Sequence, residues 1–211
     1  MSKIKNEEQK TEMLREVGNI GAGNASKALS EISQQKINVE FPSVKSIRLE
    51  EIPGKLGKRQ EIYTDVSVNV DIQEEQKEVS AGHLLLLMSY EDARNLAEVL
   101  EEKIGEEPAD KMELGELERE ALKETGNILT GASVSAITEY VDLKLVEGLP
   151  KIHTDMLGAI LDKYLLEIAE KDDEALIFET EFKFEDAEID ANFMILFEPQ
   201  GRQLVLNKMM V

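Results

Sequence analysis

The chain has 211 residues, no cysteine and a formal net charge of −20. Such a surface would be repelled by nucleic acids and anionic lipid, and the lack of cysteine excludes disulfides and thiolate metal sites. With 42% hydrophobic residues the chain can bury a core. Because "MSKIKNEEQK" is not an apolar leader and no apolar run could span a bilayer, the sequence predicts a soluble cytoplasmic protein.

The first half of the chain is predicted to begin with a helix and to continue through strands to a second helix. The expected elements are a helix at about 7–32, broken strands at 36–52 around Pro42, a loop at 50–61, a half-buried strand at 62–72, a strand at 79–88 and a helix to about Gly105. A charged turn joins the last two strands, so they should form a hairpin. Ser89 is the expected cap of the final helix, with Asp92 three residues later.

The second half repeats this order after a linker expected at 105–116. Its elements are a helix at about 114–140, a short strand at 142–147, a helix from His153 or Thr154 to about Glu170, a strand pair at 175–184 and 192–199, and a short helix or strand at 202–211. The inward stripe of the helix beginning near Thr154 should hold Leu157, Ile160, Leu161, Tyr164 and Ile168.

A shift of 108 positions superposes the two halves. The matching pairs are Glu12/Glu120, Leu14/Leu122, Glu16/Glu124, Gly18/Gly126, Asn19/Asn127, Ile20/Ile128, Gly23/Gly131, Ala28/Ala136, Glu31/Glu139 and Pro42/Pro150. This internal duplication predicts one α+β domain over 1–211, with pseudo-twofold symmetry and tandem repeats at about 7–105 and 113–211. Each repeat should follow an α-β-x-β-β order, with its long helix packed on an antiparallel sheet.

The two long helices are predicted to present the same polar face. The predicted inward residues are Leu14, Val17, Gly21, Ala25, Ala28, Ile32, Leu122, Leu129, Ala136 and Tyr140. The predicted outward residues are Glu12, Glu16, Asn19, Gly23, Ser30, Glu120, Glu124, Asn127, Gly131 and Thr138. Each Glu therefore neighbours an Asn at i,i+3, and each Gly bares backbone one turn later. Ile20 and Ile128 should lie partly outward and offer an apolar contact to a partner.

One exposed glutamate on a helix is usually only solvated. Asparagine and glycine inside a helix are different, because each costs up to about 1 kcal/mol relative to alanine. Asparagine and glycine nevertheless occur inside both long helices, at the same spacing and on the same predicted exposed face. Such repeated exceptions to helix propensity are typical of functional sites.

The residue types exclude several chemistries. No Ser/His pairing suggests an acyl-transfer triad, and His83 and His153 are expected to have core or capping roles. Asn is a weak metal ligand and no Glu-x-x-His pattern occurs, so no metal site is predicted. The glycines follow a polar helix without Gly-Lys-Ser/Thr, which excludes a P-loop. A carboxamide can, however, orient a water for in-line attack on phosphorus, while a nearby carboxylate holds a partner's lysine.

The repeated "E-x-G-N-I" helices, each followed by a proline 23 residues after the asparagine, resemble the CheC branch of the CheC/CheX/FliY chemotaxis phosphatases. The resemblance covers nearly the whole chain. It implies hydrolysis of the phospho-aspartate of the response regulator CheY, with Asn19 and Asn127 orienting water. Glu16 and Glu124 would then contact the regulator's lysine. The protein would need no cofactor of its own, because phosphorylated CheY brings the Mg²⁺.

The sequence departs from the family pattern at one position of each repeat. Glu12 and Glu120 stand where the family has Asp or Ser, which we interpret as altered docking. Two intact Glu/Asn pairs favour a two-site CheC over a one-site CheX, and the lack of a long extra domain disfavours FliY.

The same resemblance implies a second partner, the receptor deamidase CheD, bound through the helix predicted near Thr154. Asp155 could imitate a receptor side chain there, or it could simply occupy a favourable first turn of a helix. A non-catalytic adaptor that docks CheY-phosphate or CheD is the alternative function.

Overall fold

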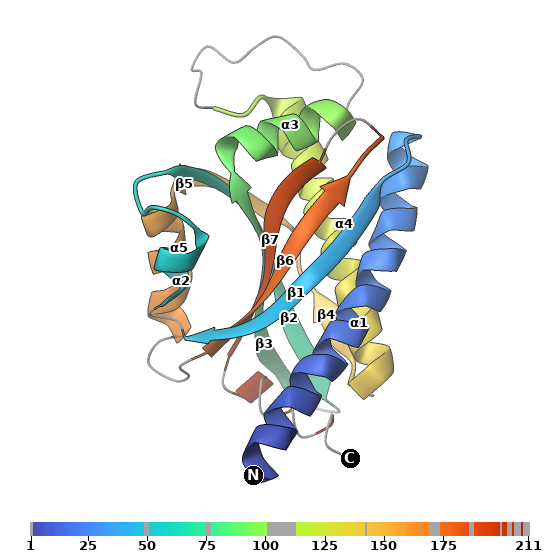
Figure 1. Ribbon diagram of the computed structural model, residues 1–211, viewed down its shortest axis with the longest axis vertical. Helices are drawn as coiled ribbons and strands as arrows, with labels where there is room; N and C mark the ends of the chain where they lie inside the picture. Colours follow the sequence, from blue (N-terminus) through green and yellow to red (C-terminus); the bar gives the residue numbers. More distant parts are fainter. Residues whose placement is uncertain are drawn as a thin grey trace.

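The computed structural model describes residues 2–48, 51–74, 77–100, 113–141, 143–168, 174–185, 188–198, 200, 201, 204 and 208. A curled antiparallel sheet lies between two helical layers (Figure 1). The helices are α1 (Ser2–Ser33), α2 (Ile52–Leu56), α3 (Tyr90–Leu100), α4 (Glu116–Val141) and α5 (Leu157–Ile168). The strands are β1 (Asn38–Arg48), β2 (Ile62–Glu74), β3 (Lys77–Ser89), β4 (Leu145–Glu147), β5 (Lys151–Met156), β6 (Glu174–Lys183) and β7 (Glu188–Phe197). This confirms the α+β class.

The seven strands of the described residues form one sheet in the order β1-β6-β7-β3-β2-β4, and β5 also pairs with β2. Every pairing is antiparallel. The predicted β2–β3 hairpin is confirmed, with Tyr63 opposite Ser89. Strands β4 and β5 occupy successive stretches of the same edge of β2, at 70–72 and 62–67.

The order of elements repeats with the 108-residue shift. Moved by 108 positions, β1 falls on β4 and β5, α2 on α5, β2 on β6, and β3 on β7. The halves also interleave, because the first strand of each half pairs with the second strand of the other. The exchange joins both repeats in one sheet, and this supports the assignment of 1–211 to a single domain, which stays a prediction.

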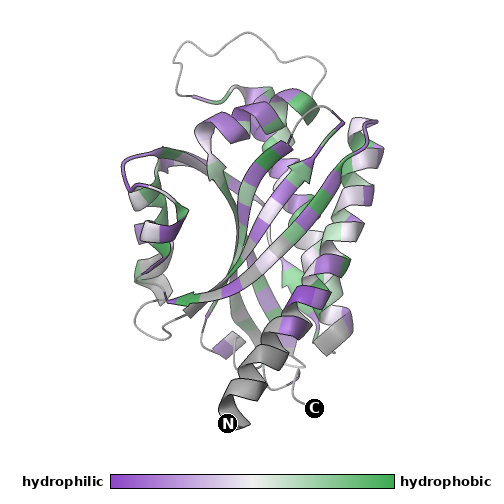
Figure 2. Cartoon of the chain, viewed as in Figure 1, coloured by the Kyte–Doolittle hydropathy of each residue, from purple (hydrophilic) through white to green (hydrophobic). Residues whose placement is uncertain are grey.

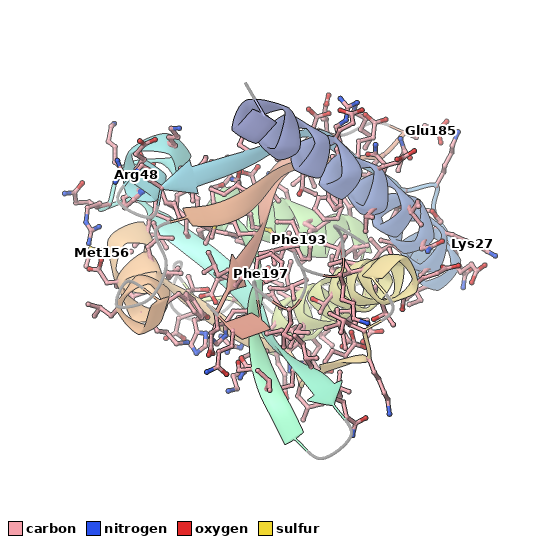
Figure 3. All side chains as sticks on the ribbon, turned by 90° about the horizontal axis from the view of Figure 1, so that it is seen from below. Lys27, Arg48, Met156, Glu185, Phe193 and Phe197 are labelled. Atoms are coloured by element: carbon pink, nitrogen blue, oxygen red, sulfur yellow. The ribbon has the colours of Figure 1, made fainter. Side chains whose placement is uncertain are left out.

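Hydrophobic clusters fill both sides of the sheet. The larger cluster packs strands against α1, α3 and α4, and includes Phe41 and Phe193, whose rings stack 6.0 Å apart. Phe193 accordingly lies in the interior in Figure 3. The smaller cluster packs the opposite face against α2 and α5. Figure 2 shows hydrophobic and hydrophilic segments interspersed along the strands.

Strand β2 is buried on both faces over residues 63–68, which the prediction of a half-buried strand missed, whereas Asn69 and Gln73 are exposed and residues 69–73 are half-buried as predicted. Its even-numbered residues Val66, Val70 and Ile72 enter the larger cluster, and Tyr63 enters the smaller one. The alternate polar residues Asp65 and Ser67 are covered as well, because α5 packs over that part of the face. Over residues 63–68 the alternation of polarity therefore reflects two different buried environments, and only beyond them does it reflect exposure.

Strand β1 is continuous across the position of Pro42. Its register with β6 shifts between Glu40 and Ser43, so the predicted break is a local irregularity that absorbs the proline. Two serines of α1 bind the start of β1. The Ser26 Oγ accepts from the Val39 amide (2.7 Å) and the Ser30 Oγ accepts from the Ile37 amide (2.9 Å). Ser30 therefore faces β1, so its prediction as an outward residue was wrong.

The inward face of α1 is rotated from the predicted one near its C-terminal end. Val17, Gly21 and Ala25 are buried as expected, but Leu29 takes the place of Ile32, which is 60% exposed. In α4 the predicted inward residues Leu122, Leu129 and Ala136 are buried. The side chains of Leu14 and Tyr140 lie outside the described ones.

Side-chain caps fix the starts of two helices. The Ser89 Oγ accepts from the Asp92 amide (3.0 Å), as predicted for the start of α3. The buried Glu118 carboxylate reaches back to the Gly115 amide (2.6 Å) at the start of α4. Glu118 also pairs with Arg94 of α3 (3.3 Å), which ties the two helices together.

Two predicted elements were wrong. The loop at 50–61 contains the short helix α2, which begins beside Pro53, a residue favoured in the first helical turn. Residues 151–156 form strand β5, and the helix begins only at Leu157, because the edge of β2 satisfies the backbone of this segment. The linker at 105–112 lies outside the described residues, as does most of 202–211, where residues 204 and 208 are helical.

Among the described residues, no helix combines the length and the apolar character needed to cross a membrane.

Candidate functional site

The first candidate site lies on the outer face of α1. Glu16 and Asn19 are exposed, and the neighbouring Ile20 is 52% exposed. A Cβ built on Gly23 would meet nothing within 4 Å. One helix face thus presents a carboxylate, a carboxamide, an apolar side chain and bare backbone to solvent, as predicted from the sequence.

The second candidate site lies on α4 and is more enclosed. Glu124 is exposed, whereas Asn127, Ile128 and Gly131 are each half-buried. Ile128 packs against the larger cluster. A Cβ built on Gly131 would lie 3.3 Å from the Glu147 Oε1, so the backbone there is covered by a carboxylate. The repeats therefore carry the same residue types at sites of different accessibility.

The two helices lie side by side on the same face of the sheet (Figure 1), and small residues allow their close approach. A Cβ on Gly21 of α1 would lie 3.3 Å from the Cα of Ser133 on α4. A Cβ on Gly126 would lie 2.4 Å from the Val66 Cγ1 on β2. Gly21 and Gly126 are therefore packing residues, and of these mid-helix glycines Gly23 has the open backbone expected of a docking surface.

The residues that depart from the family pattern occupy the same setting in both repeats. Glu12 pairs with Arg15 at 2.6 Å, and Glu120 lies 4.0 Å from Lys123. Each pair has i,i+3 spacing and an exposed carboxylate, and such pairs contribute little to stability. Each glutamate therefore places a charge one turn before the Glu/Asn pair, where a docked partner would meet it.

Asp155, the candidate for the second partner, is exposed in strand β5, opposite Tyr63. Its Oδ1 accepts from the Met156 amide at 2.7 Å. The prediction that Asp155 lies in the first turn of a helix was therefore wrong. The inward residues Leu157, Ile160, Leu161 and Tyr164 of α5 are buried as predicted, and the side chain of Ile168 lies outside the described ones.

A buried carboxylate beneath α5 was not predicted from the sequence. Asp65 of β2 is 1% exposed; its Oδ2 accepts from the Tyr164 hydroxyl (2.8 Å) and lies 3.7 Å from the His153 Nδ1. Burial raises the pKa of Asp65, opposed by the Tyr164 hydrogen bond and the charges of His153 and Lys163. The burial of Asp65 could not be predicted from its place in an alternating strand, because His153, Lys163 and Tyr164, which surround its carboxylate, are 88 or more residues away in sequence.

Two duplicated long helices, each presenting a Glu/Asn pair and packed on a shared antiparallel sheet, define a tandem-repeat α+β protein whose candidate sites suit a macromolecular partner. A family model described as the CheC-like family matches residues 11–46. The CheY-P phosphatase CheC of Bacillus subtilis (strain 168) is 30% identical over 175 residues, covering 82% of this chain and 79% of that relative. The chain belongs to the CheC-like family.

Two further proteins resemble the chain. The flagellar motor switch phosphatase FliY of Bacillus subtilis (strain 168) is 26% identical over 193 residues, which cover 90% of this chain and 46% of FliY. The crystal structure of Thermotoga maritima FliY has a TM-score of 0.72 at 18% identity and covers 96% of both chains. At that identity the structural likeness concerns the fold alone.

Proposed function

We propose that the chain is a protein aspartyl-phosphate phosphatase, a hydrolase that acts on the phosphorylated chemotaxis regulator CheY. The observation that carries the proposal is the Glu/Asn pair on each of α1 and α4, exposed on α1 and half-buried at Asn127 on α4. Its support is membership in the CheC-like family, in which the Bacillus subtilis relative is named a CheY-P phosphatase.

Hydrolysis of the phospho-aspartate needs only two side chains from this protein, a carboxamide and a carboxylate. Water adds to the phosphorus of the phospho-aspartate, the acyl phosphate P–O bond breaks, and inorganic phosphate and a free carboxylate result. The carboxamide of Asn19 or Asn127 holds the water in line, and Glu16 or Glu124 pairs with the regulator's lysine. Phosphorylated CheY supplies the Mg²⁺, so the chain needs no cofactor of its own.

The site geometry suits a partner rather than a small molecule. Glu16, Asn19 and Ile20 lie on an exposed convex helix face, whereas small-molecule sites are concave. The polar pair and its flanking isoleucine match the polar and apolar parts of a protein interface.

The test uses CheY phosphorylated by a small phosphodonor, with release of inorganic phosphate followed after the donor is removed. Catalytic amounts of this protein should accelerate release, and chelation of Mg²⁺ measures how much of the reaction depends on the partner's metal. Binding of phosphorylated CheY without acceleration would refute the phosphatase proposal and favour the non-catalytic adaptor.

We also propose that CheD binds around Asp155 and the start of α5. The exposed Asp155 and Met156, which is 47% exposed, form an acidic and apolar edge there. Figure 3 shows Met156 at the periphery beside α5. A pull-down with CheD tests the proposal.

The cytoplasmic location stays a proposal that the cysteine-free, acidic composition supports.

A further inference from the structure

The two candidate sites differ by one carboxylate that only the second repeat supplies. In the first site the space over Gly23 is open. In the second, the carboxylate of Glu147 covers Gly131, with its oxygens 3.3 and 3.4 Å from the position of an added Cβ. The 108-residue shift places Val39 at the corresponding position of the first repeat, and Val39 is buried in the core. The duplication therefore does not explain Glu147.

Strand β4 holds Glu147 in place. Glu147 pairs with Val70 of β2. Hydrogen bonds fix both ends of β4, from the Gln73 amide to the Lys144 carbonyl (2.8 Å) and from the Gly148 amide to the Asn69 carbonyl (2.9 Å). Because side chains alternate along a strand, Glu147 shares the side of Leu145, which packs into the cluster beneath α4. The carboxylate is thus directed at α4 by the sheet.

The charge of Glu147 is not neutralised by the described part of the chain, where its carboxylate has no ion-pair partner. Glu147 is exposed, but partial burial of its carboxylate raises its pKa, and no cation among the described residues opposes that effect. Gly131 follows Asn127 by four residues and Glu124 by seven, so all three lie on one helix face. The second site therefore holds an uncompensated negative charge about one turn from the asparagine that the proposed function uses.

We propose that Glu147 restricts docking of the regulator at the second Glu/Asn site. The two sites of this protein are then unequal in docking, because strand β4 of the sheet holds a carboxylate over only one of them. The proposal rests on the proposed function for the identity of the partner. A regulator that docks on α4 must displace or desolvate this carboxylate, whereas one that docks on α1 meets open backbone. If the regulator's lysine pairs with Glu124, Glu147 remains as a second charge to be buried without a partner, which weakens docking.

The kinetic test isolates each site with an asparagine variant. In the Asn19→Ala background only the second site is intact, and there Glu147→Ala should raise kcat/KM on phosphorylated CheY by roughly threefold or more, through KM. In the Asn127→Ala background the same change should have no effect. Glu139→Ala, which removes an exposed charge of α4 instead of the β4 carboxylate, is the matched control. An unchanged or lower rate for Glu147→Ala in the Asn19→Ala background would overturn the proposal.

A second test does not depend on phosphatase activity. Because the chain has no cysteine, the Asn19→Cys and Asn127→Cys variants each place one thiol at a site. Labelling rates are measured with an anionic reagent and with a neutral reagent of similar size. Glu147→Ala should raise the anionic-to-neutral ratio about threefold for Asn127→Cys and leave it unchanged for Asn19→Cys, because charge repulsion acts within about 10 Å. An unchanged ratio at both positions would refute the restriction.

The two tests separate the inference from the function on which it rests. A changed labelling ratio with no phosphatase activity in the parent would refute the proposed function and retain the restriction by Glu147. Parent activity with no effect of Glu147→Ala in either test would refute the restriction and retain the function.

Discussion

Val66 on β2 lies directly beneath Gly126 of α4, and its Cγ1 is 2.4 Å from the point where a side chain on Gly126 would place its Cβ. Val66 is 1% exposed and belongs to the larger hydrophobic cluster, so other buried residues surround it. This contact sets how closely α4 approaches the sheet. It thereby also sets the position of Asn127, the next residue of the helix. One of the mid-helix glycines is therefore required by packing.

Two glycine substitutions should have opposite effects on stability. Gly126→Ala should lower the free energy of unfolding by about 1–3 kcal/mol, because the added methyl group overpacks the contact with Val66. Gly23→Ala should raise it by up to about 1 kcal/mol, because the position is open and alanine favours the helix. Denaturant unfolding of both variants measures this. A stabilised Gly126→Ala would show that the helix can move away from the sheet.

Gly23→Ala also separates stability from docking. If the partner approaches the backbone at Gly23, this variant should be more stable than the parent but slower on phosphorylated CheY. Equal activity in the two proteins would place the docking contact elsewhere on α1.

The buried Asp65 should make stability depend on pH. Burial raises the pKa of Asp65 above its ordinary value of 3.8, so the folded protein binds the proton more tightly than the unfolded chain. The contribution of Asp65 to stability is therefore largest below pH 3.8 and falls as the pH rises through the folded pKa. In Asp65→Asn this loss is absent, while the Tyr164 hydroxyl can still donate to the amide oxygen.

The measurement is urea unfolding of the parent and Asp65→Asn at a series of pH values from 4 upward. The stability of the variant relative to the parent should increase with pH through this window and then level off. Asp162→Asn, which removes an exposed carboxylate of α5, is the control. A difference that shrinks with rising pH would mean that ion pairing with His153 and Lys163 outweighs burial.

The two site glutamates should act through docking. Glu16→Ala combined with Glu124→Ala should raise the Kd for CheY carrying a beryllofluoride phosphate mimic by about tenfold or more, because a charge pair desolvated at an interface is worth about 2 kcal/mol or more. The controls are Glu31→Ala and Glu139→Ala, an exposed pair related by the same 108-residue shift. Equal affinity of the parent and the double variant would remove Glu16 and Glu124 from the interface.

Asp155→Lys should abolish capture of CheD and leave the dephosphorylation of CheY unchanged. The change is made on an exposed strand position, so the fold should tolerate it. Capture that is indifferent to the substitution would show that Asp155 and the edge around it are structural.

Much of the fold could be predicted because the local signals agree. The helical period, the cap at Ser89 and the 108-residue repeat fixed most elements in order. The exchange of strands between halves could not be predicted, since it depends on contacts more than 80 residues apart. The same holds for β5, where the sequence predicts a helix from His153 or Thr154 because nothing local marks the edge of β2 that this strand completes.

The candidate sites were predicted from residue type and spacing, and the structure places Glu16, Asn19 and Glu124 on exposed helix faces as expected. Their roles stay predictions. The covering of Gly131 could not be predicted, because Glu147 reaches α4 only through the pairing of β4 with β2. Gly126 and Gly23 look alike in the sequence, because each is a glycine inside a helix. Only the contact with β2 shows that Gly126 is a packing residue and Gly23 an exposed one.

The most direct test of the account is phosphate release from phosphorylated CheY in the presence of Asn19→Ala, Asn127→Ala and the double variant. Each single variant should keep part of the activity, and the double variant should lose about 10²–10³ in rate, the usual cost of removing a positioned transition-state contact. Asn24→Ala, at another exposed asparagine of α1, should match the parent. A folded double variant that dephosphorylates CheY at the parent rate would contradict the account.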